Sequence, residues 1–222
     1  MASHKNLGRL AGFVFFINLI PYVIANTVIL EELLYRDDFF QALQANRGKV
    51  AWAIVLQFVS ITAMIAFAIL IFPVLRKFGS RLALGYLGLR FVEFGLLVYS
   101  IIKLISLTDL GEMVFAEGVG DVAIQEYLAE LMLLEWKWAG IIYMLVYALH
   151  CVIFFYLLSK SNIVPSLISW AGILGTILCF ININNHLFDF SFRGFFLFLP
   201  MVLVELIIAI WLLIKGFEVA EN

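Results

Sequence analysis

The sequence predicts an all-α polytopic transmembrane helical bundle, with six membrane-spanning helices and short interfacial helices in its two long outer connections. Of its 222 residues, 64% are hydrophobic and 14% are charged, whereas soluble domains are roughly 45–50% apolar and about 25% charged. The apolar residues fall in runs long enough to cross about 30 Å of hydrocarbon, which takes roughly 17–25 residues of helix. No repeat or soluble linker separates these runs. We therefore expect a single transmembrane domain over residues 1–222.

Six stretches meet the length requirement, and they lie at about residues 8–30, 50–75, 82–106, 132–158, 167–184 and 195–215. The first is longer than the core of a signal peptide, which has about 7–15 residues, and it lacks an Ala-x-Ala-like cleavage site. It should therefore stay in the mature protein. The fifth is the shortest, and we expect the polar and aromatic residues 184–189 that follow it to lie at the membrane interface.

Basic residues in the connections predict that both termini are cytoplasmic, because Lys and Arg are retained on that side of the membrane. With the N-terminus inside, seven basic residues fall in inner segments and four in outer ones: Lys5, Arg9, Arg76, Lys77, Arg81, Lys160 and Lys215 against Arg36, Arg47, Lys49 and Arg193. The bias is strongest in the tight turn at residues 76–81, which has no acidic residue. We expect a multi-pass protein of the cell membrane whose first partner is the lipid bilayer.

Both long outer connections contain the spacing of a capping box, in which the first and fourth side chains satisfy free N–H groups at a helix start. Asp38 with Gln41 predicts one short surface helix, and Asp109 with Glu112 predicts another. Residues 118–121 then predict a break and the cap of the fourth spanning helix, which would begin outside the membrane.

The second outer connection carries six acidic residues and no basic one: Asp109, Glu112, Glu117, Asp121, Glu126 and Glu130. A solvated acidic face explains them, and a site for a cation or a partner is the alternative. Further along, Trp136 and Trp138 are typical of an outer membrane interface. We interpret Lys103, Glu135 and Lys137 as interfacial anchors, since long charged side chains can reach the interface from within a span.

Five polar residues lie at membrane depth, where ionisable side chains are costly and usually face a partner inside the bundle. Four different spans supply them: Asn18, Arg90, Glu93, His150 and Glu205. Counted from the inner ends of the spans at 1.5 Å per residue, they fall within roughly 5 Å of one another in depth. We therefore predict one buried layer, slightly inside the bilayer midplane, that is either a ligand-binding site or a buried polar network.

The third span should be central. Arg90 and Glu93 are three residues apart and share one face of a helix, while Gly85, Gly88 and Gly95 point roughly the opposite way. Glycine lets membrane helices approach closely. We therefore expect this helix to contact neighbours on both sides.

Two interpretations of the layer remain open. In the structural one, Arg90 bridges Glu93 and Glu205, because a buried charge without a partner costs far more than a paired one. Asn18 and His150 would then satisfy the remaining hydrogen-bonding groups. In the functional one, two carboxylates share one guanidinium beside a histidine able to titrate, as in a proton-coupled transporter or an intramembrane acid–base site.

Other candidate sites are weaker. His186 and Asp189, three residues apart, could hold a metal, but an interfacial hydrogen-bonding loop is the simpler interpretation. Cys151 and Cys179 lie in apolar stretches and are interpreted as small buried hydrophobic residues. The sequence indicates no cofactor, and a net charge of −2 argues against nucleic acid as a partner, because nucleic-acid binders carry a basic face.

Several short motifs occur in a characteristic order: Arg9-Leu10-Ala11-Gly12, Leu89-Arg90-Phe91-Val92-Glu93, Leu149-His150, Val204-Glu205 and Trp211-Leu212-Leu213-Ile214-Lys215-Gly216. In this order the chain resembles the bacterial domain-of-unknown-function family 4386, over nearly its whole length. The resemblance implies a small bacterial membrane protein with six helices and no assigned activity. It also implies that the four ionisable residues of the layer match the charged pattern of the family.

Three classes of function follow. The sequence favours a protein that binds or transports a small or lipid-like molecule, because transporter sites lie near the midplane beside broken helices, and Pro21 followed by Asn26, and Pro200, are candidate breaks. Six helices are few for a carrier, so a homo-oligomer could be required. The alternative is a membrane accessory or sensor protein that acts through contacts, with a purely structural layer.

The third class is an intramembrane metal-dependent enzyme assembled from Glu93, His150 and Glu205. The chain has no nucleophile elbow, no His-Glu-x-x-His motif and no phosphate-binding glycine loop. An enzyme is therefore less favoured than a binding protein.

Overall fold

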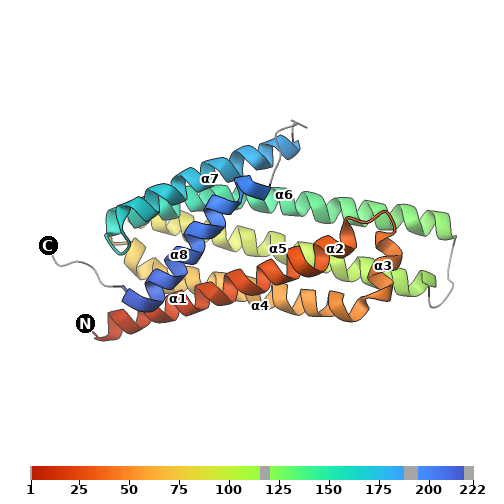
Figure 1. Ribbon diagram of the computed structural model, residues 1–222, viewed down its shortest axis with the longest axis horizontal. Coiled ribbons are helices and arrows are strands. Elements are labelled where there is room, and N and C mark those ends of the chain that lie inside the picture. Colours follow the sequence, from red (N-terminus) through yellow and green to blue (C-terminus); the bar gives the residue numbers. More distant parts are fainter. Residues whose placement is uncertain (1, 116–120, 188–194, 218–222) are drawn as a thin grey trace. The chain divides into compact units, whose positions relative to one another are not determined.

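The computed structural model describes residues 2–115, 121–187 and 195–217, and every regular element within these ranges is helical (Figure 1). In chain order the elements are α1 (Ala2–Val23), the π-helix η1 (Ile24–Leu30), α2 (Glu31–Leu34), α3 (Phe39–Ala45), α4 (Arg47–Leu75), α5 (Ser80–Phe115), α6 (Val122–Ser161), α7 (Ser166–Leu187), the 3-10 turn η2 (Phe195–Leu197) and α8 (Leu199–Lys215). The predicted all-helical class is confirmed.

Five helical segments of the described chain are long and apolar enough to cross a membrane: His4–Leu34, Arg47–Leu75, Ser80–Val114, Ala123–Ser161 and Ser166–Asn184. They correspond to the first five predicted spans. The sixth predicted span consists, in its described part, of η2 and the 17-residue α8, which is not among the five. Pro200 stands at the start of α8, where a missing N–H costs nothing. The predicted sixth span is interrupted between η2 and α8, next to Pro200, and the proline itself lies in the first turn of α8.

The first outer connection contains the predicted short helix, α3, but not the predicted cap. Asp38 makes no hydrogen bond to the start of α3. Arg36 instead donates to it from Nε at 2.7 Å and from Nη2 at 2.9 Å, and this hydrogen bonding lowers the pKa of Asp38 from its usual value. The guanidinium gives the carboxylate two charge-assisted hydrogen bonds, so both carboxylate oxygens are bonded to Arg36 instead of to the start of α3.

The second predicted surface helix is wrong, because α5 continues without interruption to Phe115 and contains both Asp109 and Glu112. The inward face of this helix stays apolar beyond the predicted end: Leu104, Leu107 and Val114 are buried in one cluster. The cap of the next helix is confirmed. The backbone N–H of Ala123 donates to Asp121 Oδ1 at 2.9 Å, and α6 begins between them.

The predicted break in the first span takes the form of a π-helix. The chain changes from α1 to η1 shortly after Pro21, whose ring removes one backbone donor. Side chains satisfy nearby carbonyls: Asn26 Nδ2 donates to Tyr22 O at 2.9 Å, and Thr27 Oγ1 donates to Val23 O at 2.7 Å. Helix therefore continues across the break in a wider form.

The chain forms two compact units. Unit 1 takes Met1–Ile17, Ala63–Phe94 and Tyr143–Asn222, and unit 2 takes Asn18–Thr62 and Gly95–Ile142. Helices α1, α4, α5 and α6 contribute residues to both. Each unit has its own apolar core: Phe15, Phe67, Tyr86 and Phe155 are among the fully buried side chains of unit 1, and Leu30, Leu33, Leu34, Leu43 and Leu104 among those of unit 2.

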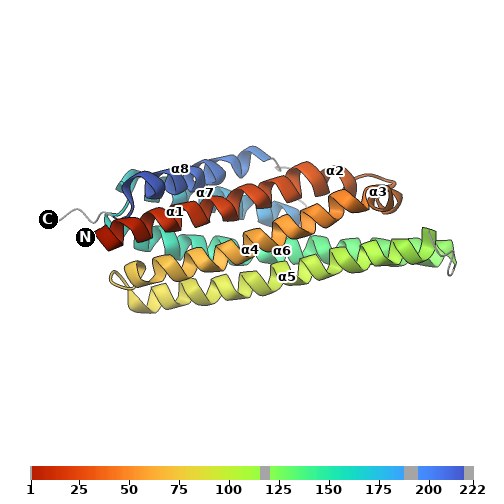
Figure 2. The ribbon, with the colours of Figure 1, turned by 90° about the horizontal axis from the view of Figure 1, so that it is seen from below.

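Close helix packing within unit 1 depends on glycines of α1 and α7. A Cβ atom added to Gly12 would stand 2.6 Å from the backbone nitrogen of Leu213 and 2.9 Å from the carbonyl oxygen of Ala209, and one added to Gly175 would stand 3.2 Å from the backbone of Met201. Helix α8 therefore packs against both α1 and α7, and both contacts can be followed in the two ribbon views (Figures 1 and 2).

The glycines of α5 do not play the predicted role. An added Cβ atom would meet nothing within 4 Å at Gly88 or Gly95, and only a side-chain methyl of Ile153, at 3.9 Å, at Gly85. All three lie on an exposed face of α5. The expected close approach of a neighbouring helix on this face is therefore wrong.

Candidate functional site

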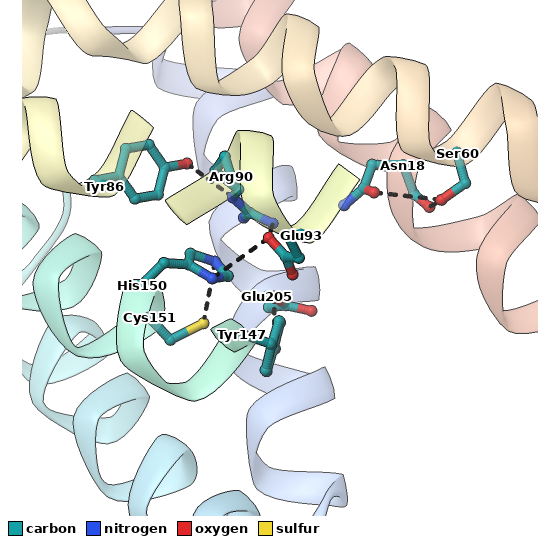
Figure 3. A network of polar contacts seen from close by, with 9 residues as sticks. All are labelled: Asn18, Ser60, Tyr86, Arg90, Glu93, Tyr147, His150, Cys151 and Glu205. Carbon is teal, nitrogen blue, oxygen red and sulfur yellow. Dashed lines mark hydrogen bonds and ion pairs between the residues drawn. The ribbon is translucent and has the colours of Figure 1, made fainter. Parts of the chain in front are cut away.

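About two turns of α5 place an arginine, a glutamate and a tyrosine on the same buried face of unit 1. Arg90 donates from Nη1 to Glu93 Oε2 at 3.1 Å and from Nε to the Tyr86 hydroxyl at 3.4 Å (Figure 3). The side chains of Arg90 and Glu93 are 5% and 0% exposed. Residues three and four apart are neighbours on a helix surface, so the sequence of α5 alone builds this ion pair.

Helix α6 adds a histidine from the other side. His150 is fully buried, and its Nδ1 lies 3.5 Å from Glu93 Oε2. The His150 ring lies 5.7 Å from the Tyr86 ring and 5.2 Å from the Tyr147 ring, measured between centroids. Its Nε2 contacts the sulfur of Cys151 at 3.5 Å. The predicted meeting of the third and fourth spans through these residues is what the structure shows.

Helix α8 contributes the second carboxylate, Glu205, which is 8% exposed. Tyr147 donates from its hydroxyl to Glu205 Oε1 at 2.9 Å. Among the described residues, no ion pair joins Glu205 to Arg90. The structure therefore differs from the predicted bridge, because the phenol of Tyr147 holds the carboxylate that Arg90 was expected to hold.

We call the four residues Arg90, Glu93, His150 and Glu205 the charged cluster; Figure 3 shows their side chains pointing toward one another. Among the described residues, two buried atoms of the cluster, Glu93 Oε1 and His150 Nδ1, have no hydrogen-bond partner. Most buried side-chain polar atoms in proteins have at least one partner. The cluster is therefore an incompletely satisfied polar network inside an apolar unit.

Asn18, the fifth residue of the predicted layer, belongs to unit 2. Ser60 donates from Oγ to the carbonyl oxygen of Asn18 at 2.7 Å and to its Oδ1 at 3.3 Å. One step further along the same helices, Gln57 Nε2 donates to Asn26 Oδ1 at 2.9 Å. The described partners of Asn18 are therefore neutral groups of α4.

The sequence did not single out three residues that touch the charged cluster. Tyrosines in apolar runs are common packing residues, so the sequence does not distinguish Tyr86 and Tyr147 from other tyrosines. Their spacing is the available signal, because they stand four residues before Arg90 and three before His150. Cys151 was interpreted as a small hydrophobic residue. It is buried as predicted, but its sulfur also contacts the imidazole.

The anchor residues of unit 2 have partners of their own. Lys103 Nζ lies 2.5 Å from Glu135 Oε2, and Lys137 Nζ lies 5.1 Å from the centre of the Tyr35 ring. These contacts are consistent with stable anchors whose charges are partly exposed.

The predicted metal sites receive no support from the described residues. Asp189 and the side chain of His186 lie outside them. Within the described ranges, no group of three His, Cys, Asp or Glu side chains is placed to hold a metal ion. Glu93, His150 and Glu205 therefore do not form the three-ligand site that an intramembrane metal-dependent enzyme would need.

Comparison with known proteins gives one match. The family described as Domain of unknown function (DUF4386) matches residues 10–216. No curated protein and no solved structure matches the chain. The matched residues include the whole charged cluster.

Proposed function

The chain belongs to the DUF4386 family, and we propose that it is a six-span membrane protein that binds or moves a small or lipid-like molecule at the charged cluster. Five described segments already meet the requirement for a span. At 1.5 Å per residue, the 17 residues of α8 extend about 26 Å, close to the thickness of the hydrocarbon layer. The excess of basic residues in the inner connections supports cytoplasmic termini.

The observation that carries the proposal is the unpartnered Oε1 atom of Glu93, a residue that is 0% exposed. A buried polar atom without a partner costs about 1–3 kcal/mol, and more when the group is charged. A purely structural network would be expected to satisfy this atom. A ligand that donates a hydrogen bond would satisfy it, so the cluster has the character of a site that is completed by binding.

The surroundings fit a ligand site. Three helices, α5, α6 and α8, supply the polar groups, as in sites between the helices of bundles. In unit 2, η1 interrupts the first span after Pro21. Interrupted helices recur in transporters, and π-helical segments are frequent at functional sites. The polar groups from three helices and the interrupted first span both favour a protein that binds a ligand and changes conformation. They are less typical of a protein with a purely structural polar network.

Native mass spectrometry of the protein purified in lipid nanodiscs tests the proposal. We expect the wild type to retain a co-purified molecule that the double variant Arg90→Gln/Glu93→Gln loses. This variant removes both charges of the pair together and leaves no unpaired charge behind, so the fold should survive. Arg47→Gln, which removes a charge in unit 2, is the control and should retain the molecule. Equal occupancy in wild type and double variant, with both folded, would reject the proposal.

A contact-based accessory or sensor role is the second candidate. The observation that favours it is the exposed pair Glu126 and Glu130, four residues apart on one face of α6. We expect Glu126→Gln/Glu130→Gln to abolish co-purification of a basic partner protein if this role is correct. Unchanged co-purification with that variant would leave the binding role as the better account.

A further inference from the structure

We infer that the charged cluster accepts a cationic head group with N–H donors, an amine or ammonium, rather than an anion. This inference rests on the proposed function, in that it names the chemical class of the ligand bound there. It depends on three features of unit 1: the balance of charges, the unpartnered carboxylate oxygen and the aromatic side chains next to the cluster.

With the imidazole of His150 neutral, the charged cluster is short of one positive charge. Arg90 is the permanent cation of the cluster, whereas Glu93 and Glu205 are both carboxylates. Glu93 pairs with the guanidinium, and the described hydrogen bond of Glu205 comes from a neutral phenol, that of Tyr147. A buried charge is stable only when it is paired. A ligand with one positive charge would balance the second carboxylate, whereas an anion would add another uncompensated negative charge.

The hydrogen-bonding groups point to a donor. Glu93 Oε1 is an acceptor without a partner, and Glu205 accepts one described bond although a carboxylate has room for about four. An ammonium group carries three donors and could bond to both carboxylates. An anionic ligand would instead compete with Glu93 for the guanidinium of Arg90. Glu93 would then be a buried carboxylate without an ion-pair partner, which is unfavourable.

The aromatic side chains next to the cluster also suit a cation. Arg90 lies 5.6 Å from the centre of the Tyr86 ring, so that face already holds a cation. On α6, the rings of Tyr143 and Tyr147 lie 6.2 Å apart beside His150, and ring faces attract cations. A Ca²⁺ ion takes about 6–8 oxygen ligands, whereas the two carboxylates supply at most four.

A proton is the competing cation, because it would neutralise a carboxylate as an amine would. The groups that face Glu205 are Tyr147 and Cys151 of α6, Cys179 of α7, and Arg90 and Glu93 of α5. Glu93 also faces His150 of α6, whose Nδ1 lies 3.5 Å from Oε2. Arginine stays charged, and the phenol and thiols are neutral near pH 7 in their ordinary state. Proton and amine should therefore compete for the carboxylates, and amine binding should strengthen as the pH rises.

Four probes with the same six-carbon chain test the inference by calorimetry on the full chain in nanodiscs. They are hexylammonium, hexyltrimethylammonium, hexanol and hexanoate. We expect saturable binding of hexylammonium, at least about 10-fold tighter than that of hexyltrimethylammonium, which lacks N–H donors, because hydrogen bonds to charged groups contribute about 1.5–3 kcal/mol. Hexanol and hexanoate should not bind. The affinity for hexylammonium should rise between about pH 6 and about pH 8, near the range where buried carboxylates and histidine titrate.

Two isosteric variants and one control locate the site. Glu205→Gln and Glu93→Gln should each weaken hexylammonium binding by at least about 10-fold, and each is checked for an elution profile like that of the wild type. Glu93→Gln should also melt at a lower temperature, because it leaves the buried guanidinium of Arg90 without its partner. Glu126→Gln, an exposed carboxylate on α6, should bind as the wild type does. Binding that is the same in all three variants would place the amine elsewhere and overturn the inference.

Failure of the inference and failure of the proposed function are distinguishable. If hexanoate binds and the Arg90→Gln/Glu93→Gln variant loses it, the cluster is a ligand site but the cationic class is wrong. If stability changes with pH in the wild type but no amine binds, the cluster takes only a proton, and the amine assignment is overturned. If no probe binds and the wild type retains no co-purified molecule, the inference and the proposed function are both rejected.

Discussion

Unit 1 buries charges, whereas unit 2 buries neutral polar groups and keeps its charges near the surface. In unit 1 the side chains of Arg90 and Glu93 are 5% and 0% exposed. In unit 2 the buried polar side chains include Gln57 and Ser60, which bond to amide groups. The ion pairs of unit 2 are only partly buried; in the pair Arg47–Glu112, the side chains are 40% and 46% exposed.

The two units differ in the free-energy cost of the polar groups that they bury: neutral groups cost little, whereas ions cost several kcal/mol. A neutral amide in a helix interface can be satisfied by one or two neighbouring groups, and such contacts contribute about 0.6 kcal/mol on average. Removing an ion from water costs several kcal/mol even after relaxation. Ionisable groups at membrane depth are therefore functional candidates by default, which directs attention to unit 1.

The largest expected effect is on the charged pair. Arg90→Met should lower the free energy of unfolding by about 3–5 kcal/mol, because it leaves a buried carboxylate without its partner. Reversible unfolding in detergent micelles, followed by circular dichroism, measures the change. The double variant Arg90→Met/Glu93→Gln should recover most of the loss, since replacing both partners of a buried pair is often nearly neutral. If the double variant is as unstable as the single one, the pair is not what makes unit 1 different.

The local part of the charged cluster could be predicted from the sequence, and the part between helices could not. The shared face of Arg90 and Glu93 follows from their spacing on one helix. The bond from Tyr147 to Glu205 depends on how α6 and α8 are rotated toward each other, and no local pattern encodes that rotation. For the same reason the sequence predicts an ion pair between Arg90 and Glu205 and gives no sign of the hydrogen bond from Tyr147.

The fold shows the same limit. Helix existence follows from composition and run length, so five spans were found with approximately correct bounds. Helix ends and helix neighbours depend on packing: buried leucines of unit 2 carry α5 past the capping-box spacing at Asp109. A glycine permits close helix packing but does not require it. Its position in the sequence therefore could not show that Gly12 packs against a neighbouring helix whereas Gly88 does not.

A smaller effect is expected in the neutral network of unit 2. Gln57→Leu removes the hydrogen bond to Asn26 and should lower the free energy of unfolding by about 0.6 kcal/mol, and by no more than about 1.7 kcal/mol. It also removes the unpartnered Oε1 atom of Gln57, which offsets part of the loss. Thr62→Ala, at an exposed position of α4, is the control in the same assay. A loss as large as that of Arg90→Met would remove the contrast between the units.

The smallest effect should come from the partly exposed ion pair of unit 2, in which Arg47 Nη2 lies 2.5 Å from Glu112 Oε2. Exposed pairs contribute little, because water and salt screen the charges and two long side chains must be held in place. Arg47→Gln, Glu112→Gln and the double variant should therefore unfold close to the wild type at low and high salt, with no measurable coupling in the double-mutant cycle. A strong coupling that salt does not weaken would mean that this pair behaves as a buried one. The contrast between the buried charges of unit 1 and the partly exposed charges of unit 2 would then fail, and the strength of an ion pair would no longer single out the charged cluster.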